Sequence, residues 1–298
     1  MTTSTTHSDE PDPRRQARPA TLRQTLPLAH SLVVVTRAAT KNTAIVGKLE
    51  RLGAEVLSVP TIRFAPAADP APLNAALDRI KESGTEAFRW VAFTSSTGVD
   101  FFFKRSKEIG IPLSTWNDFR FAVVGPTTAS MLSSVGIKSG RVVIGSKANA
   151  LGNVLVNGDF PEIEAGDRCL VPQANIARND LQDLLTAAGV EVESVTTYQT
   201  VCEDKEKAKP FLEAVAAERH IAALTFASPS AFENFLFMTD PVGERVMRES
   251  SVPLFSIGPT TSLAIQERGF SVAAQASPYT TGGLVHVIAE YLNTAEAQ

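Results

Sequence analysis

Short apolar runs alternate along the chain with longer segments whose apolar residues stand three or four positions apart. The first run covers residues 32–35, and the segment after it carries Ile45, Leu49 and Leu52 before Gly53. A short continuous apolar run is typical of a buried strand, and the wider spacing is typical of one helix face. Glycine commonly follows the last helical residue. The pattern therefore predicts a strand at 32–35 and a helix that ends near Gly53.

The same alternation continues to the end of the chain. Further strands are expected at 54–60, 90–94, 121–125, 141–144, 168–171, 190–196, 221–226, 253–257 and 270–274. Helices are expected at about 72–83, from near Ser96, from Thr127 or Thr128, and near 149–157. Short strands rich in Val and Ile that alternate with helices indicate parallel sheets covered on both faces. The predicted class is α/β, and the pattern leaves the strand order open.

The chain also repeats itself. Residues 33–64 align with 169–200, and the segment from Phe93, "FTSSTGVDFFF", aligns with "FASPSAFENFL" from Phe226. Gly-Pro-Thr-Thr occurs at 125–128 and again at 258–261. "ALGNVLV" and "GLVHVIA" form a fourth matching pair. Four blocks in the same order indicate that one unit was duplicated.

Composition narrows the class of protein. The chain has 298 residues, of which 44% are hydrophobic and 20% charged, with a net charge of −4. That length suggests two domains, and the charge does not suggest nucleic-acid binding. The apolar runs are too short to cross a membrane. Two cysteines and four scattered histidines predict no metal site, and low cysteine content without an export signal favours a cytoplasmic location. Residues 1–30 are polar, hold four of the 18 prolines, and are expected to form a disordered tail.

Polar residues follow several of the predicted strands directly. They occur in "VAFTSSTGV" and "LTFASPSAF", and in "VVGPTT" and "SIGPTT". Ligands of open parallel sheets bind at the carboxyl ends of the strands, where helix N-termini can hold carboxylate or phosphate. Ser and Thr cap such helices, and Pro is favoured at their start. One segment of this kind is an ordinary cap, whereas four in two equivalent sets favour an anion-binding cleft.

Taken together, these blocks resemble the uroporphyrinogen-III synthase family. The resemblance rests on "VEVESVTTYQTV", "LTFASPSAFENFL", "FSIGPTTSLAIQERGF" and "SPYTTGGLVHVI", with "WVAFTSSTGVDFFF" and "FAVVGPTTASMLSSVGI" in the first half. It covers about residues 32–289. It implies two similar α/β domains joined by a two-stranded linker, with the active site in the cleft between them. Domain one would hold 31–64 plus 202–292, domain two 65–201, and the tail 1–30.

The family's reaction needs no cofactor. The linear polycarboxylate hydroxymethylbilane loses water and closes with inversion of ring D, which gives uroporphyrinogen III on the way to haem, sirohaem and cobalamin. The resemblance therefore implies hydroxymethylbilane as substrate and no cofactor. A transient contact with hydroxymethylbilane synthase is a further expectation. We also expect a monomer with mobile domains, because two thin linkers would join them.

The resemblance assigns roles to particular residues. Tyr198 matches the family's tyrosine that assists departure of the substrate hydroxyl, and a phenol with a pKa of about 10 donates a hydrogen bond without carrying charge. The expected substrate-binding residues follow the strands: Arg37, Ser95, Ser96, Thr127, Thr128, Ser228, Ser230, Thr260 and Thr261. The plainer interpretation makes Tyr198 a half-buried strand residue and each Ser or Thr a helix cap only.

Two other functions remain open from the sequence. The first is a non-catalytic tetrapyrrole or anion sensor with the same fold. The second is an unrelated two-domain protein that closes around a ligand by hinge motion. The isomer of uroporphyrinogen that the protein forms would separate the enzyme from both.

Overall fold

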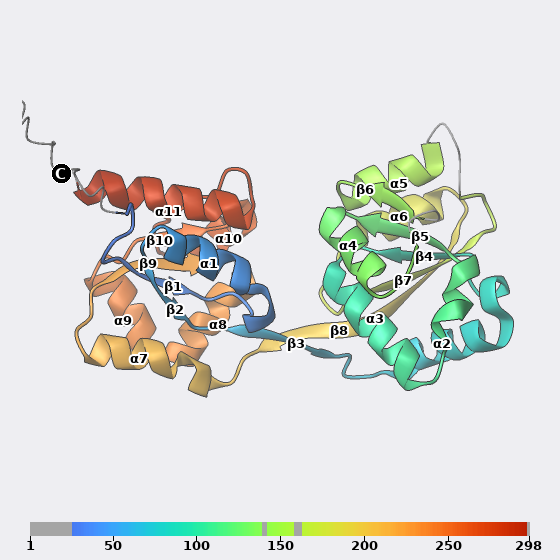
Figure 1. Ribbon diagram of the computed structural model, residues 1–298, viewed down its shortest axis with the longest axis horizontal. Helices are drawn as coiled ribbons and strands as arrows, with labels where there is room; N and C mark the ends of the chain where they lie inside the picture. The colour runs from blue at the N-terminus through green and yellow to red at the C-terminus, as the bar shows by residue number, and fades with distance from the viewer. Residues whose placement is uncertain (1–25, 139–141, 158–162, 297–298) are drawn as a thin grey trace, which may run out of the picture.

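Two sheets, each covered by helices, form two domains that are joined by a pair of strands (Figure 1). The computed structural model describes residues 26–138, 142–157 and 163–296. The first domain is built on a five-stranded sheet with the order β11-β10-β9-β1-β2, and the second on a six-stranded sheet with the order β3-β8-β7-β4-β5-β6. The predicted α/β class is confirmed.

In the first domain every strand pairing is parallel. Its strands are β1 (Leu32–Val35), β2 (Glu55–Ser58), β9 (Ile221–Phe226), β10 (Leu254–Ser256) and β11 (Ala274–Gln275). Its helices are η1 (Ala39–Lys41), α1 (Thr43–Arg51), η5 (Lys205–Ala208), α7 (Lys209–Ala216), α8 (Pro229–Thr239), α9 (Val242–Glu249), α10 (Pro259–Glu267) and α11 (Thr281–Glu296). One core cluster lies under α1 and α11, and another under α7 to α10.

The second domain contains strands from the middle of the chain. They are β3 (Ile62–Pro66), β4 (Trp90–Phe93), β5 (Arg120–Val124), β6 (Val142–Gly145), β7 (Arg168–Ala174) and β8 (Glu191–Cys202). The helices are α2 (Ala71–Ser83), η2 (Gly84–Glu86), α3 (Ser96–Glu108), η3 (Leu113–Asp118), α4 (Pro126–Ser134), α5 (Ala148–Asn157) and α6 (Asp180–Ala187). One core cluster includes residues of α2, α3 and α4, and the other residues of α5 and α6. Each sheet therefore contains strands from both halves of the repeat.

The strand β8 belongs to both the second sheet and the linker. It pairs in parallel with β7 as far as Ala174↔Tyr198, and antiparallel with β3 from Pro66↔Tyr198 to Ile62↔Cys202. Figure 1 shows this ribbon running from one domain to the other. Tyr198 thus stands where β8 changes its partner.

Thr61 fixes the other end of the ribbon in the first domain. Its side chain is fully buried, and its hydroxyl lies 3.1 Å from the carbonyl oxygen of Thr36 and 3.0 Å from that of Ala231. The backbone N–H of Glu203 donates to the carbonyl of Thr61 at 3.1 Å. Both strands of the linker are therefore held where they enter the first domain.

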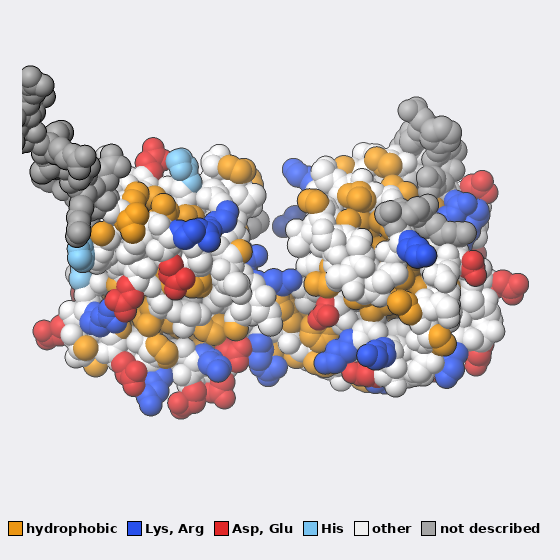
Figure 2. Space-filling model, in the orientation of Figure 1, with side chains coloured by type: hydrophobic (Ala, Val, Ile, Leu, Met, Phe, Trp, Pro, Cys, Tyr) orange, Lys and Arg blue, Asp and Glu red, His pale blue; other side chains and the backbone are white. Residues whose placement is uncertain are grey.

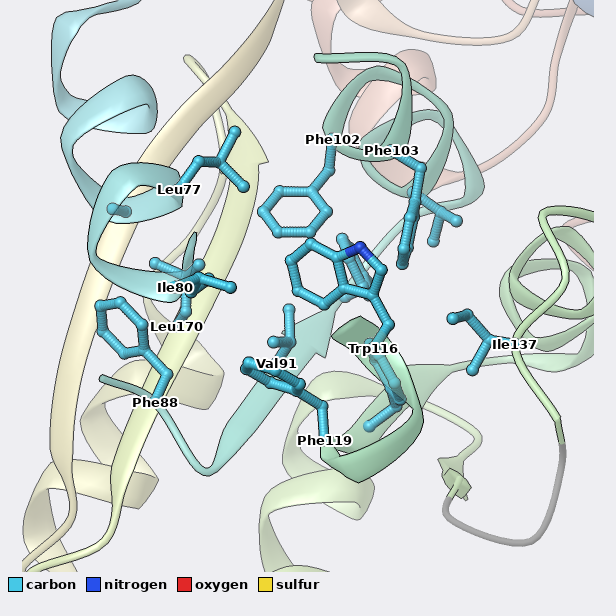
Figure 3. Packing of buried hydrophobic residues seen from close by; sticks show 14 of the residues in the cluster. Leu77, Ile80, Phe88, Val91, Phe102, Phe103, Trp116, Phe119, Ile137 and Leu170 are labelled. Atoms are coloured by element: carbon cyan, nitrogen blue, oxygen red, sulfur yellow. The ribbon is translucent and has the colours of Figure 1, made fainter. Parts of the chain in front are cut away.

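An aromatic cluster fills one side of the second domain (Figure 3). Trp116 is 1% exposed, and its ring centre lies 5.2 Å from that of Phe102, 5.3 Å from Phe103 and 5.0 Å from Phe119. Edge-to-face and tilted rings at such distances add to the free energy gained by burial. Trp116 thereby links η3 to α3, whose N-terminus reaches the candidate site.

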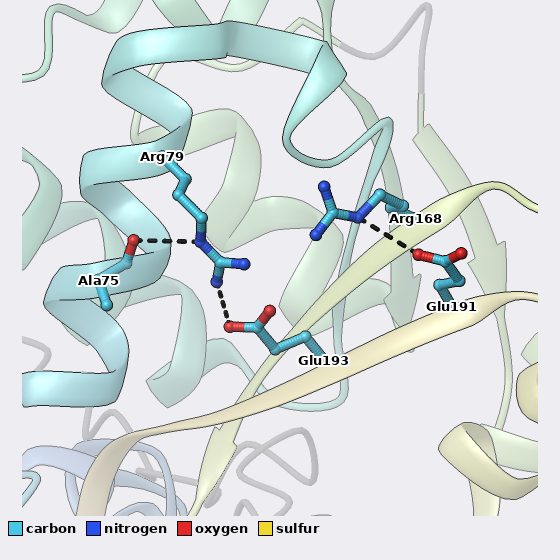
Figure 4. Close-up of polar contacts among 5 residues, drawn as sticks. All are labelled: Ala75, Arg79, Arg168, Glu191 and Glu193. Atoms are coloured by element: carbon cyan, nitrogen blue, oxygen red, sulfur yellow. Dashed lines mark hydrogen bonds and ion pairs between the residues drawn. The ribbon is translucent and has the colours of Figure 1, made fainter.

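Ion pairs hold the first half of β8 against its neighbours (Figure 4). Arg79 of α2 pairs with Glu193, and its Nε donates to the carbonyl of Ala75 at 3.3 Å. Arg168 Nε of β7 lies 3.5 Å from Glu191 Oε2. These side chains are 35–70% exposed, so each pair contributes about 1 kcal/mol or less.

The predicted tail and the last predicted strand are wrong in detail. Residues 26–30 are not part of a tail: Leu28 is fully buried in the core under α1, and its N–H donates to the carbonyl of Leu52 at 2.8 Å. Residues 1–25, the rest of the predicted tail, lie outside the described residues. The strand expected at 270–274 is shorter and begins later: β11 covers only Ala274–Gln275, and Phe270 lies before it in the core cluster under α7 to α10. No helix in the described ranges is long and apolar enough to cross a bilayer.

Candidate active site

A cavity of about 400 Å³ lies between the domains. The first domain contributes residues 38–41 to its wall, the linker Arg63, Phe64 and Glu203, and the second domain Ser96, Thr97, Asp100, Phe101 and Met131. Because η1 follows β1 and α3 follows β4, the carboxyl ends of both sheets point to this cavity. Open parallel sheets bind their ligands at this edge.

Serine side chains cap the two equivalent helices, as the sequence predicts. Ser95 Oγ accepts a hydrogen bond from the N–H of Gly98 at 3.0 Å, and Ser228 Oγ accepts one from Ala231 at 3.1 Å. The hydroxyl of Ser230 lies 3.1 Å from that of Ser228. The repeated motif therefore makes the same cap in each domain.

The Gly-Pro-Thr-Thr segments differ from the prediction. The helices α4 and α10 begin at the prolines, and Gly125 and Gly258 occupy the N-cap positions without a side-chain cap. The expectation that a threonine caps these helices is wrong, because Pro takes the first helical position and moves both threonines into the first turn. Gly125 also has φ near 80°, which favours glycine.

The two threonines of each segment have different environments. Thr128 and Thr261 are 4% and 1% exposed, whereas Thr127 and Thr260 are exposed. The N–H of Thr261 donates to the carbonyl of Gly258 at 3.1 Å. The hydroxyls of Thr127 and Thr260 are thus the ones that solvent reaches, and this arrangement is the same in both copies.

Tyr198 lies beside the cavity between two aromatic side chains. Tyr198 is 7% exposed, and its phenol oxygen lies 3.1 Å from Ser95 Oγ. The ring stacks on Phe101 with centres 5.5 Å apart and meets Phe64 edge-on at 5.7 Å. Both phenylalanines line the cavity. The phenol is therefore held at the N-terminus of α3, one residue from the cavity-lining Ser96.

This environment favours the protonated phenol. Burial raises the pKa of Tyr198 above its ordinary value, and the hydrogen bond with Ser95 lowers it in part. The pKa of Tyr198 is thus higher in the folded than in the unfolded state. The stability that the folded state gains from holding this phenol protonated is present below about pH 10, and it is lost as the pH rises through the folded pKa. At neutral pH Tyr198 is thus an uncharged proton donor.

Ser95→Ala should raise the pKa of Tyr198 further, because it removes the hydrogen bond that lowers it. The chain has three tyrosines, so the phenolate absorbance of wild type minus that of Tyr198→Phe isolates this group. The matched variant Ser228→Ala removes the equivalent cap, at a similar cost of about 1 kcal/mol, and should leave the titration unchanged. An equal shift in both variants would contradict the assignment of the Ser95 contact.

Two basic side chains of the first domain follow β1. Arg37 Nη1 donates to Thr281 Oγ1 at 2.7 Å, and burial lowers the pKa of its guanidinium from the ordinary value. Lys41 Nζ lies 3.2 Å from Ser96 Oγ in the second domain. The sequence prediction included Arg37 and missed Lys41 and Phe101. Phe101 could have been found, since it stands four residues after Thr97 on one helix face.

Neither cysteine of the chain lines the cavity. Cys169 and Cys202 are free, and burial raises the pKa of Cys169 to about 12. Within the ranges that the structure describes, no group of three His, Cys, Asp or Glu side chains could hold a metal ion. The polar groups at the cavity are hydroxyls, the neighbouring phenol, and basic and acidic side chains.

A family model described as Uroporphyrinogen-III synthase HemD matches residues 43–286. The chain belongs to the uroporphyrinogen-III synthase family. It is therefore an enzyme of tetrapyrrole biosynthesis and a cyclase of the lyase type. The matched range includes the linker, both caps and both Gly-Pro-Thr-Thr segments.

Relatives and solved structures agree with this family. The chain is 27% identical over 270 residues to uroporphyrinogen-III synthase of Synechococcus elongatus, covering 89% of this chain and 97% of that one. It is 28% identical to the chloroplastic synthase of Oryza sativa, over 70% of this chain and 65% of the relative. A mutant Thermus thermophilus synthase matches with a TM-score of 0.53 at 17% identity, covering 89% of this chain and 99% of the other. The uroporphyrinogen-III synthetase of Helicobacter pylori matches with a TM-score of 0.53 at 15% identity, covering 87% of this chain and 97% of the other. At these identities the two structures support the fold.

Proposed function

We propose that the cavity between the domains binds hydroxymethylbilane and closes it to uroporphyrinogen III with inversion of ring D and loss of water. The observation that carries this proposal is the pairing of the Tyr198 phenol with Ser95 beside a cavity that both domains line. The domains must hold a long flexible substrate in one shape, which reduces the entropy cost of ring closure.

Tyr198 acts in this proposal on the substrate hydroxyl. The phenol donates its proton as the carbon–oxygen bond breaks, so that the hydroxyl leaves as water. The methylene cation left behind then bonds to the substituted carbon of ring D and gives a spiro intermediate. The bond from that carbon to its old methylene bridge breaks, the bridge bonds to the free carbon of ring D, and the proton which that carbon loses returns to the phenolate. A raised pKa keeps the donor protonated at neutral pH, as general acid catalysis requires.

Substrate carboxylates would bind around this donor. Ser96, Thr127 and Thr260 present accessible groups in the first turns of helices, while Ser95, Ser228 and Ser230 order the caps beside them. Thr128 and Thr261 support the same turns from their buried positions. Arg37 adds a positive charge near the first-domain helices. Helix N-termini and a guanidinium are suited to carboxylates.

The test is an isomer assay. The purified protein is mixed with a deaminase that produces hydroxymethylbilane, the products are oxidised, and the porphyrin isomers are separated. Dominant isomer III is the expected result. Isomer I alone, from a folded protein that still binds the product, would contradict the enzyme and favour the anion-sensor function.

We further propose that residues 31–64 with 202–292, and residues 65–201, are the two units that move during turnover. The protein would act as a cytoplasmic monomer and contact hydroxymethylbilane synthase only transiently. Size-exclusion chromatography with light scattering should therefore give the mass of one chain. A single sharp peak at twice that mass would contradict the monomer.

A further inference from the structure

Lys41 reaches from the first domain across to the second. It is the last residue of η1, and its Nζ lies 3.2 Å from the hydroxyl of Ser96 in the first turn of α3. Both residues line the cavity, and both side chains are half-buried. The ammonium group of Lys41 therefore lies in the cavity wall beside the second domain, although its backbone belongs to the first domain.

The other charged side chains of the cavity come from the linker and from α3. Arg63 and Glu203 belong to the linker, and Asp100 lies one helical turn beyond Ser96 on α3. Figure 2 shows Lys and Arg side chains gathered on both sides of the hollow between the domains. Lys41 is thus the first-domain cation at the end of the cavity where α3 begins.

The contact between Lys41 and Ser96 joins a full charge to a neutral acceptor. A hydroxyl is a weaker partner for an ammonium group than a carboxylate, which forms shorter and stronger charge-assisted hydrogen bonds. The lysine side chain has a flexible stem with three donors, so it can change partners without moving the backbone. A carboxylate entering the cavity would replace Ser96 as the better acceptor.

We propose that Lys41 binds a carboxylate of the substrate and, through it, holds the two domains together around the ligand. This inference rests on the proposed function, because it takes hydroxymethylbilane as the ligand. The first domain would then supply the charge, and the second domain Ser96 and the Tyr198 phenol. Release of the product would require Lys41 to separate from that carboxylate.

Lys41→Gln should raise KM for hydroxymethylbilane about 10-fold with kcat unchanged, since it removes binding that ground and transition states share. Lys41→Arg, which keeps the charge, should restore most of the affinity. Lys209→Gln is the matched control: this lysine on α7 is exposed and lies 3.8 Å from Glu213, away from the cavity. Its KM should equal that of wild type.

A second readout does not depend on turnover. Uroporphyrinogen III under anaerobic conditions should bind Lys41→Gln about 10-fold more weakly than wild type. Small-angle X-ray scattering should show a smaller radius of gyration when wild type binds this product, and little change in Lys41→Gln. Circular dichroism melting would confirm that each variant is folded.

The outcomes separate the two proposals. If wild type makes isomer III and Lys41→Gln keeps both KM and product affinity, the role of Lys41 is wrong and the enzyme function stands. A fall in kcat at constant KM, with a displaced alkaline limb of the pH profile, would make Lys41 a proton donor and overturn carboxylate binding. If wild type makes only isomer I, the proposed function fails, and product affinity alone decides the role of Lys41.

Discussion

Tyr198→Phe should lower kcat about 100-fold, the lower end of what one positioned proton donor contributes. The reason is that the variant keeps the aromatic packing between Phe64 and Phe101 and removes only the phenol oxygen that lies 3.1 Å from Ser95. Because the substrate cyclises without the enzyme to isomer I, the residual product should shift towards that isomer. The measurement is single-turnover formation of each isomer.

The loss should be partial because, in the proposed site, many contacts share the binding of the substrate. Thr261→Ala, at the buried threonine of α10, is therefore also expected to give a partial loss. Complete loss of activity in both folded variants would contradict a catalytic effect that is spread over the cavity. Unchanged isomer III formation by Tyr198→Phe would instead remove Tyr198 from the mechanism.

Trp116→Ala should lower the free energy of unfolding of the second domain by about 3–5 kcal/mol. The substitution empties the centre of an aromatic cluster in which three phenylalanine rings lie within 5.3 Å, centre to centre. Both tryptophans of the chain, Trp90 and Trp116, belong to this domain. Fluorescence of the remaining Trp90 therefore follows unfolding of the second domain alone.

The matched variant is Phe235→Ala in the first domain. Phe235 is fully buried, with its ring centre 4.9 Å from that of Phe211. If the two domains are independent units, this variant should leave the tryptophan transition unchanged and lower a second transition seen by circular dichroism. If both variants move both transitions together, the chain unfolds as one cooperative unit and the proposed division is wrong.

Periodicity predicted the α/β class and most of the strands, because buried parallel strands are short apolar runs that the sequence shows directly. The serine caps were also predictable, since Ser95 and Ser228 each precede a helical pattern and supply the hydroxyl that its first turn needs. The threonines of the Gly-Pro-Thr-Thr segments misled the prediction. Their hydroxyls are of the right type for capping, but the proline before them already begins the helix.

Contacts between the domains could not be read from the pattern. Lys41 and Ser96 are 55 positions apart and belong to different sheets, so neither hydrophobic spacing nor the repeat brings them together. The repeat compares equivalent positions in two units, whereas this contact joins non-equivalent ones. Leu28 was missed for a related reason: its burial depends on the core under α1 and not on its own polar surroundings.

The linker ribbon has a consequence for how the enzyme can open. One end is fixed by Thr61 in the first domain and the other by the pairing of β8 with β7, so rotation between the domains must be absorbed as torsion of the antiparallel pair of β3 and β8. Tyr198 stands at the end of that pair which is built into the second sheet. In the proposed mechanism Tyr198 and Ser95 therefore move together as one preassembled half of the site. Lys41 would move with the other half and would meet them anew in each catalytic cycle.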